Sequence, residues 1–172
     1  MNAADQAGQY MAAGPGLAGQ VIALLTRRRL SVAVAESLTG GLLGAALTAV
    51  PGASAVFRGG ITAYATDIKS ALLGVSPAFL AEHGAVHPDV AAAMADGART
   101  RLGAAVGMAT TGVAGPDPQE GKAPGTVHIA VSSEHFRVVR SLSLAGDRDE
   151  IRRQTVEQCL SLVWIALTEE EK

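Results

Sequence analysis

The sequence is poor in the residues on which several classes of protein depend. Its 172 residues include one cysteine, three lysines and six aromatic residues. The single cysteine, Cys159, excludes an intrachain disulfide and a thiolate metal centre. Apolar runs are short and broken by glycine or charge, so no transmembrane helix is expected. The net charge is −2 with no basic stripe, which argues against nucleic acid as a main partner.

Small residues take the place of the missing aromatics. The chain has 33 alanines and 20 glycines, and its apolar fraction of 48% with a mean hydropathy of +0.25 predicts a folded protein. The core must therefore be built from alanine, valine, leucine and isoleucine, with elements that approach each other closely. Residues 1–16 end in Gly-Pro-Gly and are predicted to be a flexible tail, and residues 17–172 a single domain. No signal-peptide pattern is present, so the cytoplasm is the expected location.

Hydrophobic periodicity predicts strands and helices that alternate along the chain. Apolar residues at helical spacing, with glycine or proline at the ends, predict helices over 17–29, 42–49, 66–74, 76–83, 88–102 and 147–167. Short apolar or alternating runs predict strands over 31–36, 57–64, 104–109, 126–131 and 136–144, the last two as a hairpin. Such interleaving is typical of a single α/β domain.

Two polar turns follow predicted buried strands, and we expect chemistry there. They are Glu36–Gly41 and Thr110–Gly115. Ligands of α/β sheets bind beyond the carboxyl ends of strands, where a hydroxyl can act as a nucleophile and free amide groups can hold an anion. Neither turn matches the nucleophile-elbow or P-loop pattern. From position alone, Ser37 is therefore either a nucleophile or a structural residue that caps the helix at Leu42 or stabilises the turn.

A serine nucleophile needs a base, and the sequence offers lysine more readily than histidine. None of the four histidines lies in a comparable turn or shows metal-ligand spacing, so neither a Ser-His-Asp triad nor a metal site is predicted. Lysine can act as a base when burial lowers its pKa. Lys172 is terminal and Lys122 lies in a polar loop, whereas Lys69 follows the strand 57–64 on the first turn of a helix. Tyr64 ends that strand.

Several linked motifs resemble the CinA C-terminal family. They are Ala-Glu-Ser-Leu-Thr-Gly-Gly (35–41), Phe-Arg-Gly-Gly-Ile-Thr-Ala-Tyr (57–64) with Lys69 and Leu-Leu-Gly-Val (72–75), His-Gly-Ala-Val (83–86), Thr-Gly-Val-Ala-Gly-Pro (111–116), Gly-Thr-Val (125–127) and Gly-Asp-Arg (146–148) with Ile-Arg-Arg (151–153). They occur in the family's order and cover about residues 20–165.

The resemblance implies a fold and an activity. The fold is a three-layer α/β/α sandwich with a mixed, mostly parallel sheet. The activity is hydrolysis of the amide of nicotinamide mononucleotide (PncC type), giving nicotinic acid mononucleotide and ammonia without a metal or cofactor. Longer members carry an additional N-terminal domain, so this chain resembles the stand-alone form. The family usually forms homo-oligomers, so we expect one here, with no nucleic-acid or membrane partner.

The same resemblance assigns roles position by position. Ser37 matches the proposed nucleophile and Lys69 the proposed base. Tyr64 matches a residue that lines the nicotinamide pocket and orients the amide, and it is predicted as a third catalytic residue, because either Lys69 or Tyr64 can protonate the leaving ammonia. The remaining matches are predicted to bind the substrate; they are Thr39, Gly40, Gly41, Thr111, Gly112 and Arg148.

Three departures from the family pattern leave alternatives open. Leu38 replaces a residue that is commonly cysteine, and His87 stands where serine is usual. The segment 115–122 replaces a shorter glycine-rich stretch, which bears on substrate preference. One alternative is a hydrolase of a different nucleotide or amide. The other is a non-catalytic, competence-related interaction module with a vestigial pocket.

Overall fold

The structure, a computed structural model, describes residues 16–169, so the predicted tail lies outside the described residues except for Gly16. The described part contains six α-helices, one short 3-10 helix and five strands. In chain order they are α2 (Leu17–Arg28), β1 (Val32–Glu36), α3 (Leu42–Thr48), η1 (Ala53–Ala55), β2 (Phe57–Thr62), α4 (Thr66–Leu73), α5 (Pro77–His83), α6 (Pro88–Arg101), β3 (Val106–Gly112), β4 (Thr126–Ser132), β5 (Arg137–Ser143) and α7 (Arg148–Glu169).

The five strands form one mixed sheet in the order β2-β1-β3-β4-β5. Strands β2, β1 and β3 are parallel, and β4 is antiparallel to both β3 and β5. Four strands thus run in one direction and only β4 is reversed, which confirms the expected mixed, mostly parallel sheet. The short connection between β4 and β5 requires this reversal, because a tight turn can join only antiparallel neighbours.

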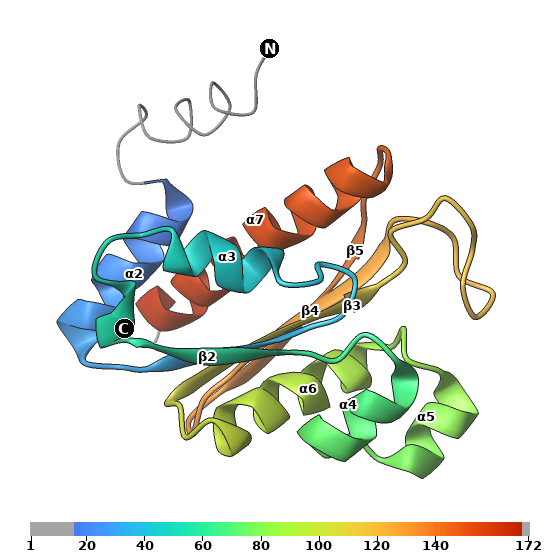
Figure 1. Cartoon of the computed structure of the whole chain (residues 1–172), viewed down its shortest axis with the longest axis horizontal. Coiled ribbons are helices and arrows are strands. Elements are labelled where there is room, and N and C mark those ends of the chain that lie inside the picture. Colours follow the sequence, from blue (N-terminus) through green and yellow to red (C-terminus); the bar gives the residue numbers. More distant parts are fainter. Residues whose placement is uncertain (1–15, 170–172) are drawn as a thin grey trace.

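Helices cover both faces of the sheet and give three layers. Helices α2, α3 and α7 lie on one face, and α4, α5 and α6 lie on the other (Figure 1). Strand β1 shows why both faces need cover. Val32 and Val34 belong to the core beneath α2, α3 and α7, whereas Ala33 and Ala35 belong to the core beneath α6. A strand buried on both faces reads as a continuous apolar run, which is what the sequence has here.

The small residues around α6 allow the backbones of α4 and β3 to approach the backbone of α6 closely. A Cβ added at Gly97 would lie 2.1 Å from the carbonyl oxygen of Leu73, and one at Gly107 would lie 2.0 Å from that of Ala95. Neither distance is possible for a real side chain, so α4 and β3 pack directly on the backbone of α6. The lean core expected from the composition is confirmed at these two contacts.

One predicted boundary differs where it matters for the site. Strand β3 runs to Gly112, whereas the sequence suggested that the turn begins at Thr110. Thr110 and Thr111 stay in the strand because they pair with Ile129 and His128 of β4. Threonine is β-branched and well suited to a strand, so a polar residue at this position does not end one. The other predicted elements agree to within a few residues, and none of the described helices is long and apolar enough to cross a membrane.

Candidate active site

A cavity of about 290 Å³ lies beyond the carboxyl ends of β1 and β3. Four segments that are distant in the sequence meet around it: the turn after β1, the end of β2, the loop after β3 and the start of α7. Its lining residues are Ser37, Leu38, Tyr64, Gly112, Val113, Ala114, Gly115, Pro116, Asp117, Pro118, Gln119 and Arg148. Of the residues predicted from the sequence, the cavity brings together Ser37, Tyr64, Gly112 and Arg148.

Ser37 lies in a turn whose backbone is held on both sides. Its amide N–H donates to the carbonyl oxygen of Thr110 at 3.0 Å, and its own carbonyl accepts the N–H of Gly40 at 3.1 Å. The residue is only 8% exposed, yet its hydroxyl makes no hydrogen bond to any described residue. The N-cap of α3 is Gly41, without a side-chain capping bond, so the capping role considered for Ser37 is wrong. The Ser37 hydroxyl thus neither caps α3 nor forms a hydrogen bond that stabilises the turn.

Glu36 caps α3 instead, a role that the sequence analysis missed. Its buried carboxylate accepts the amide N–H groups of Gly41 at 2.9 Å, Leu43 at 3.0 Å and Gly44 at 2.8 Å. A carboxylate is stabilised at a helix N-terminus by the unpaired N–H groups and the helix dipole. An acidic residue just before a glycine-rich turn and a helix was the available signal. These three bonds fix the turn that carries Ser37.

The same bonds limit where an anion can bind in this turn. The N–H groups of Gly40 and Gly41 already donate to Ser37 and Glu36, so they do not offer the free donors expected from the sequence. Thr39 is buried outside the cavity lining, and its hydroxyl shares a 2.8 Å hydrogen bond with the Thr110 hydroxyl. Within the turn 37–41, the amides of Leu38 and Thr39 are the ones that have no acceptor among residues 16–169.

Lys69 has a buried amine, which is rare for lysine. The residue is 1% exposed, and its Nζ donates to the carbonyl oxygens of Ala63 at 2.7 Å and Tyr64 at 3.0 Å. Ala63 in turn donates its N–H to the carbonyl of Glu36 at 2.9 Å, the residue just before Ser37. Burial lowers the pKa of Lys69 to about 8, against a smaller opposing effect of the Glu120 charge. A substantial fraction of this amine is therefore neutral near physiological pH.

The lowered pKa of Lys69 predicts a pH-dependent stability. Between pH 8 and 10 the unfolded chain still binds the lysine proton that the native state has released, so the free energy of unfolding rises with pH. Relative to Lys69→Met, the wild-type protein should gain about 2 kcal/mol over this interval. Urea unfolding of both proteins at pH 8 and pH 10 measures the difference. An equal change in the two proteins would mean that the native amine has an ordinary pKa.

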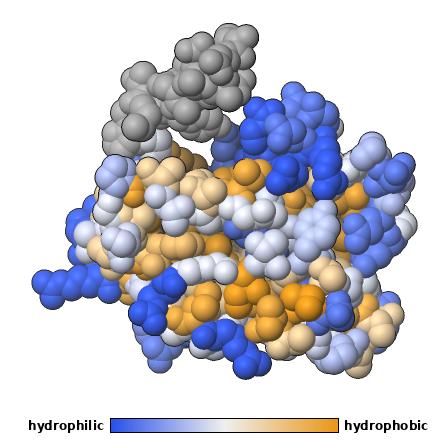
Figure 2. Space-filling model, viewed as in Figure 1, coloured by the Kyte–Doolittle hydropathy of each residue, from blue (hydrophilic) through white to orange (hydrophobic). Residues whose placement is uncertain are grey.

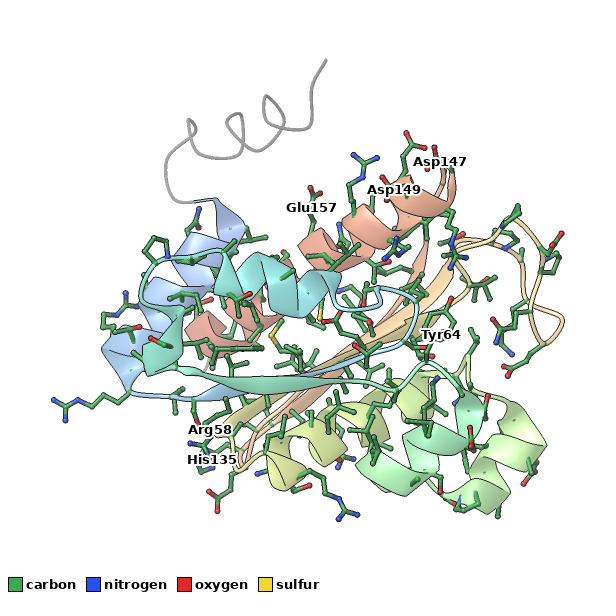
Figure 3. All side chains as sticks on the ribbon, in the orientation of Figure 1. Arg58, Tyr64, His135, Asp147, Asp149 and Glu157 are labelled. Carbon is green, nitrogen blue, oxygen red and sulfur yellow. The ribbon has the colours of Figure 1, made fainter. Side chains whose placement is uncertain are left out.

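Tyr64 and Arg148 form the rim of the cavity. Tyr64 follows β2, is 58% exposed and lies at the opposite end of the sheet from Arg58 and His135 (Figure 3). The Tyr64 hydroxyl accepts a hydrogen bond from an Arg148 Nη at 2.9 Å, and the other Nη donates to the carbonyl of Gly115 at 2.6 Å. Arg148 begins α7, where Figure 2 shows a strongly hydrophilic area of the surface. The arginine thus joins three of the four segments around the cavity.

Thr111 lies behind the cavity rather than in its lining. It is 1% exposed, and its hydroxyl donates to the carbonyl of Ala85 at 2.8 Å. This bond ties the end of β3 to the segment between α5 and α6. The predicted contact of Thr111 with substrate therefore gains no support from the geometry, while Gly112, one residue later, does line the cavity.

His128 and Cys159 are buried titratable residues outside the cavity lining. In the part of the chain that the structure describes, no three His, Cys, Asp or Glu residues are grouped as a metal site. His128 is buried and bonds to Ser141 at 2.9 Å, and burial together with the nearby His87 and Lys122 lowers its pKa. Burial also raises the pKa of Cys159, with a further effect of Glu36, so this thiol is not a nucleophile at neutral pH.

Taken together, the fold and the cavity define a three-layer α/β/α domain with a serine and a buried lysine at the carboxyl ends of parallel strands. The family model of the CinA C-terminal domain matches residues 15–167. A CinA-like protein from Frankia casuarinae is 55% identical over 157 residues, which cover 91% of this chain and 36% of that protein. A putative competence-damage inducible protein from Halalkalibacterium halodurans is 47% identical over 139 residues, 80% of this chain and 33% of that protein.

Solved structures agree with these sequence relatives. The crystal structure of the competence/damage inducible protein CihA from Agrobacterium tumefaciens has a TM-score of 0.84 and 38% identity, with 88% of this chain and 93% of that chain covered. A CinA superfamily protein from Enterobacter cloacae has a TM-score of 0.85 and 30% identity, with 88% and 90% covered. The chain belongs to the CinA C-terminal domain family, and it spans about a third of the length of the curated relatives that it matches.

Proposed function

We propose that this domain hydrolyses the carboxamide of nicotinamide mononucleotide to give nicotinic acid mononucleotide and ammonia. Two observations together carry the proposal. The Ser37 hydroxyl lies in the cavity lining without a hydrogen bond to a described residue. The buried Lys69 amine, of lowered pKa and outside that lining, is linked through Ala63 to the carbonyl of Glu36, the residue before Ser37. The family resemblance supplies the substrate. A cavity of about 290 Å³ is near the lower end of the range for small-molecule sites, which suits a mononucleotide better than a polymer.

The hydrogen bonds of Lys69 prepare it to act as a base. A neutral amine has two N–H groups and one lone pair. Two carbonyl oxygens, those of Ala63 and Tyr64, accept from Nζ. When the amine is neutral, both N–H groups are therefore satisfied and the lone pair is free to accept a proton. In the proposed mechanism this proton comes from the Ser37 hydroxyl, which must approach Nζ during the reaction because the two groups share no hydrogen bond in the structure. The same two carbonyls stabilise the ammonium after the transfer, so Lys69 can keep the proton until it donates it to the leaving nitrogen.

The reaction proceeds in two halves. Lys69 takes the Ser37 proton as Oγ forms a bond to the carboxamide carbon, and the carbonyl oxygen becomes an oxyanion. Collapse of this intermediate breaks the C–N bond, and the Lys69 ammonium protonates the leaving nitrogen, which departs as ammonia. Water then attacks the Ser37 ester while Lys69 takes its proton. The acid is released, and the proton returns to Ser37.

The cavity also provides groups for the oxyanion and the nucleotide. The amide of Leu38 is adjacent to the nucleophile and donates to no other described residue, so it is the candidate oxyanion donor. One such donor is typically worth about 3 kcal/mol. Arg148 has donors beyond the two that it uses, and it is the positive charge in the cavity lining, so we assign it to the phosphate.

A second candidate function is hydrolysis of a different nucleotide amide. The loop 115–122, which departs from the family pattern, supplies Gly115–Gln119 of the lining and therefore bears on selectivity. Purified protein should be assayed for ammonia release at pH 8 against a panel of pyridine and purine nucleotides. We expect nicotinamide mononucleotide to give the highest kcat/KM. A better substrate in the panel would replace it in the proposal, and no release from any member would favour the non-catalytic interaction module.

A further inference from the structure

Residues 115–122, of which Gly115–Gln119 line the cavity, are here called the wall loop, and they end in a tight turn. The backbones of Gln119 and Lys122 exchange two hydrogen bonds of 3.1 and 2.9 Å. Between them, Glu120 and Gly121 have φ angles of 53° and 72°, the left-handed pair that a two-residue hairpin turn requires. Glutamate is uncommon in this conformation. Here its side chain has a hydrogen-bond partner outside the turn.

That partner is the segment between α5 and α6. The two carboxylate oxygens of Glu120 accept the amide N–H groups of Ala85 at 3.0 Å and Val86 at 3.1 Å. Gly84 leaves room for this contact, since a Cβ there would lie 2.3 Å from a Glu120 carboxylate oxygen. On its other side, Ala85 accepts the Thr111 hydroxyl at the end of β3. Figure 1 shows the loop between β3 and β4, in orange, projecting beyond the sheet on the side of α5.

The wall loop is therefore fastened at both ends to opposite layers of the protein. At its start, Arg148 from α7 donates to the carbonyl of Gly115. At its end, Glu120 binds the segment between α5 and α6. The intervening residues, Pro116–Gln119, line the cavity, and Gln119 is the one among them that hydrogen-bonds to another described residue, in its turn with Lys122. Removal of either attachment would free the wall to move away from the bound substrate.

We propose that Glu120 is a positioning residue of this site: its carboxylate clamps the wall loop onto the amides of Ala85 and Val86 and so holds the cavity in a shape that binds the nucleotide. The inference rests on the proposed function for the identity of the ligand. Glu120 acts through the backbone that it holds rather than by touching the reacting atoms. Its negative charge also raises the pKa of Lys69 against the effect of burial, which links the clamp electrostatically to the proposed base.

Glu120→Ala, Glu120→Gln and a control, Glu134→Ala, test the clamp. Glu134 is an exposed carboxylate in the turn between β4 and β5, at the opposite end of the sheet. Hydrogen exchange of the Ala85 and Val86 amides should accelerate about tenfold or more in Glu120→Ala and less in Glu120→Gln, whose amide oxygen can still accept one N–H. Neither amide should change in Glu134→Ala.

Kinetics with nicotinamide mononucleotide complete the test. We expect Glu120→Ala to raise KM about tenfold with little change in kcat, Glu120→Gln to lie between it and the wild type, and both to move the acid limb of the pH profile to lower pH. Unchanged exchange, or kinetics that match Glu134→Ala in an active wild-type background, would overturn the clamp. Absence of activity in the wild type would instead overturn the proposed function, and exchange would still show whether Glu120 holds the loop.

Discussion

Replacement of Ser37 by alanine should abolish ammonia release from nicotinamide mononucleotide while leaving the fold and substrate binding intact. Loss of a catalytic serine typically costs a factor of about 10⁴–10⁶ in kcat. The Ser37 hydroxyl makes no hydrogen bond to a described residue, so its removal should leave the free energy of unfolding within about 0.5 kcal/mol of the wild type. This variant should therefore lose its activity while its free energy of unfolding stays close to that of the wild type.

Ser54→Ala is the matched control for the loss of a hydroxyl. Ser54 is exposed on η1, before the start of β2 and away from the cavity, so this variant should keep full activity. Calorimetric titration of Ser37→Ala with nicotinamide mononucleotide should give an affinity close to the wild-type KM when chemistry is slow relative to dissociation. A Ser37→Ala protein that turns over at the wild-type rate would show that another group attacks the amide.

The second large effect is expected at Lys69. Lys69→Met keeps the bulk of the side chain in a buried site but removes the base, so kcat/KM should fall by about 10³-fold or more. Lys69→Arg should fail equally, because a guanidinium stays protonated at every pH at which the protein folds. Arg27→Met, which removes an exposed cation at the end of α2, should have no effect.

The proposed role of Lys69 also predicts the direction in which kcat/KM changes with pH. The base acts as the neutral amine, and a pKa of about 8 means that the active fraction grows with pH until that point. Wild-type kcat/KM should therefore rise about tenfold per unit below pH 8 and level off above it. A profile that is flat from pH 6 to pH 9 would show that Lys69 does not transfer the proton.

Much of the architecture could be predicted because each element carries its own local signal. The apolar run before Glu36, the proline at the start of α6 and the alternating hairpin strands all act within a few residues of themselves. Part of the candidate site could be predicted from the sequence for the same reason. Ser37 follows a buried strand, and Lys69 lies early in a helix where a purely structural cation is unfavourable.

The remaining features depend on contacts between distant segments. The Lys69 amine is buried because α4 packs so that it meets the carbonyls that follow β2. The hydrophobic periodicity of the sequence does not predict this burial. Glu120 reaches residues 34 and 35 positions away, and its turn has no sequence signal beyond the following glycine. The end of β3 was misplaced because the pairing of Thr110 with β4 outweighs its polar character. Glu36 is the exception, since an acid before a helix start is a local signal.

We propose that Ser37 is the nucleophile that hydrolyses the amide of nicotinamide mononucleotide. Ammonia and nicotinic acid mononucleotide should therefore be measured together, over time, in one reaction of purified protein with nicotinamide mononucleotide at pH 8. We predict that the two products form in equal amounts with the wild type and that neither forms with Ser37→Ala. Unchanged nucleotide or release of free nicotinamide would show that the protein does not hydrolyse this amide. Equal product formation by Ser37→Ala would show that Ser37 is not the nucleophile.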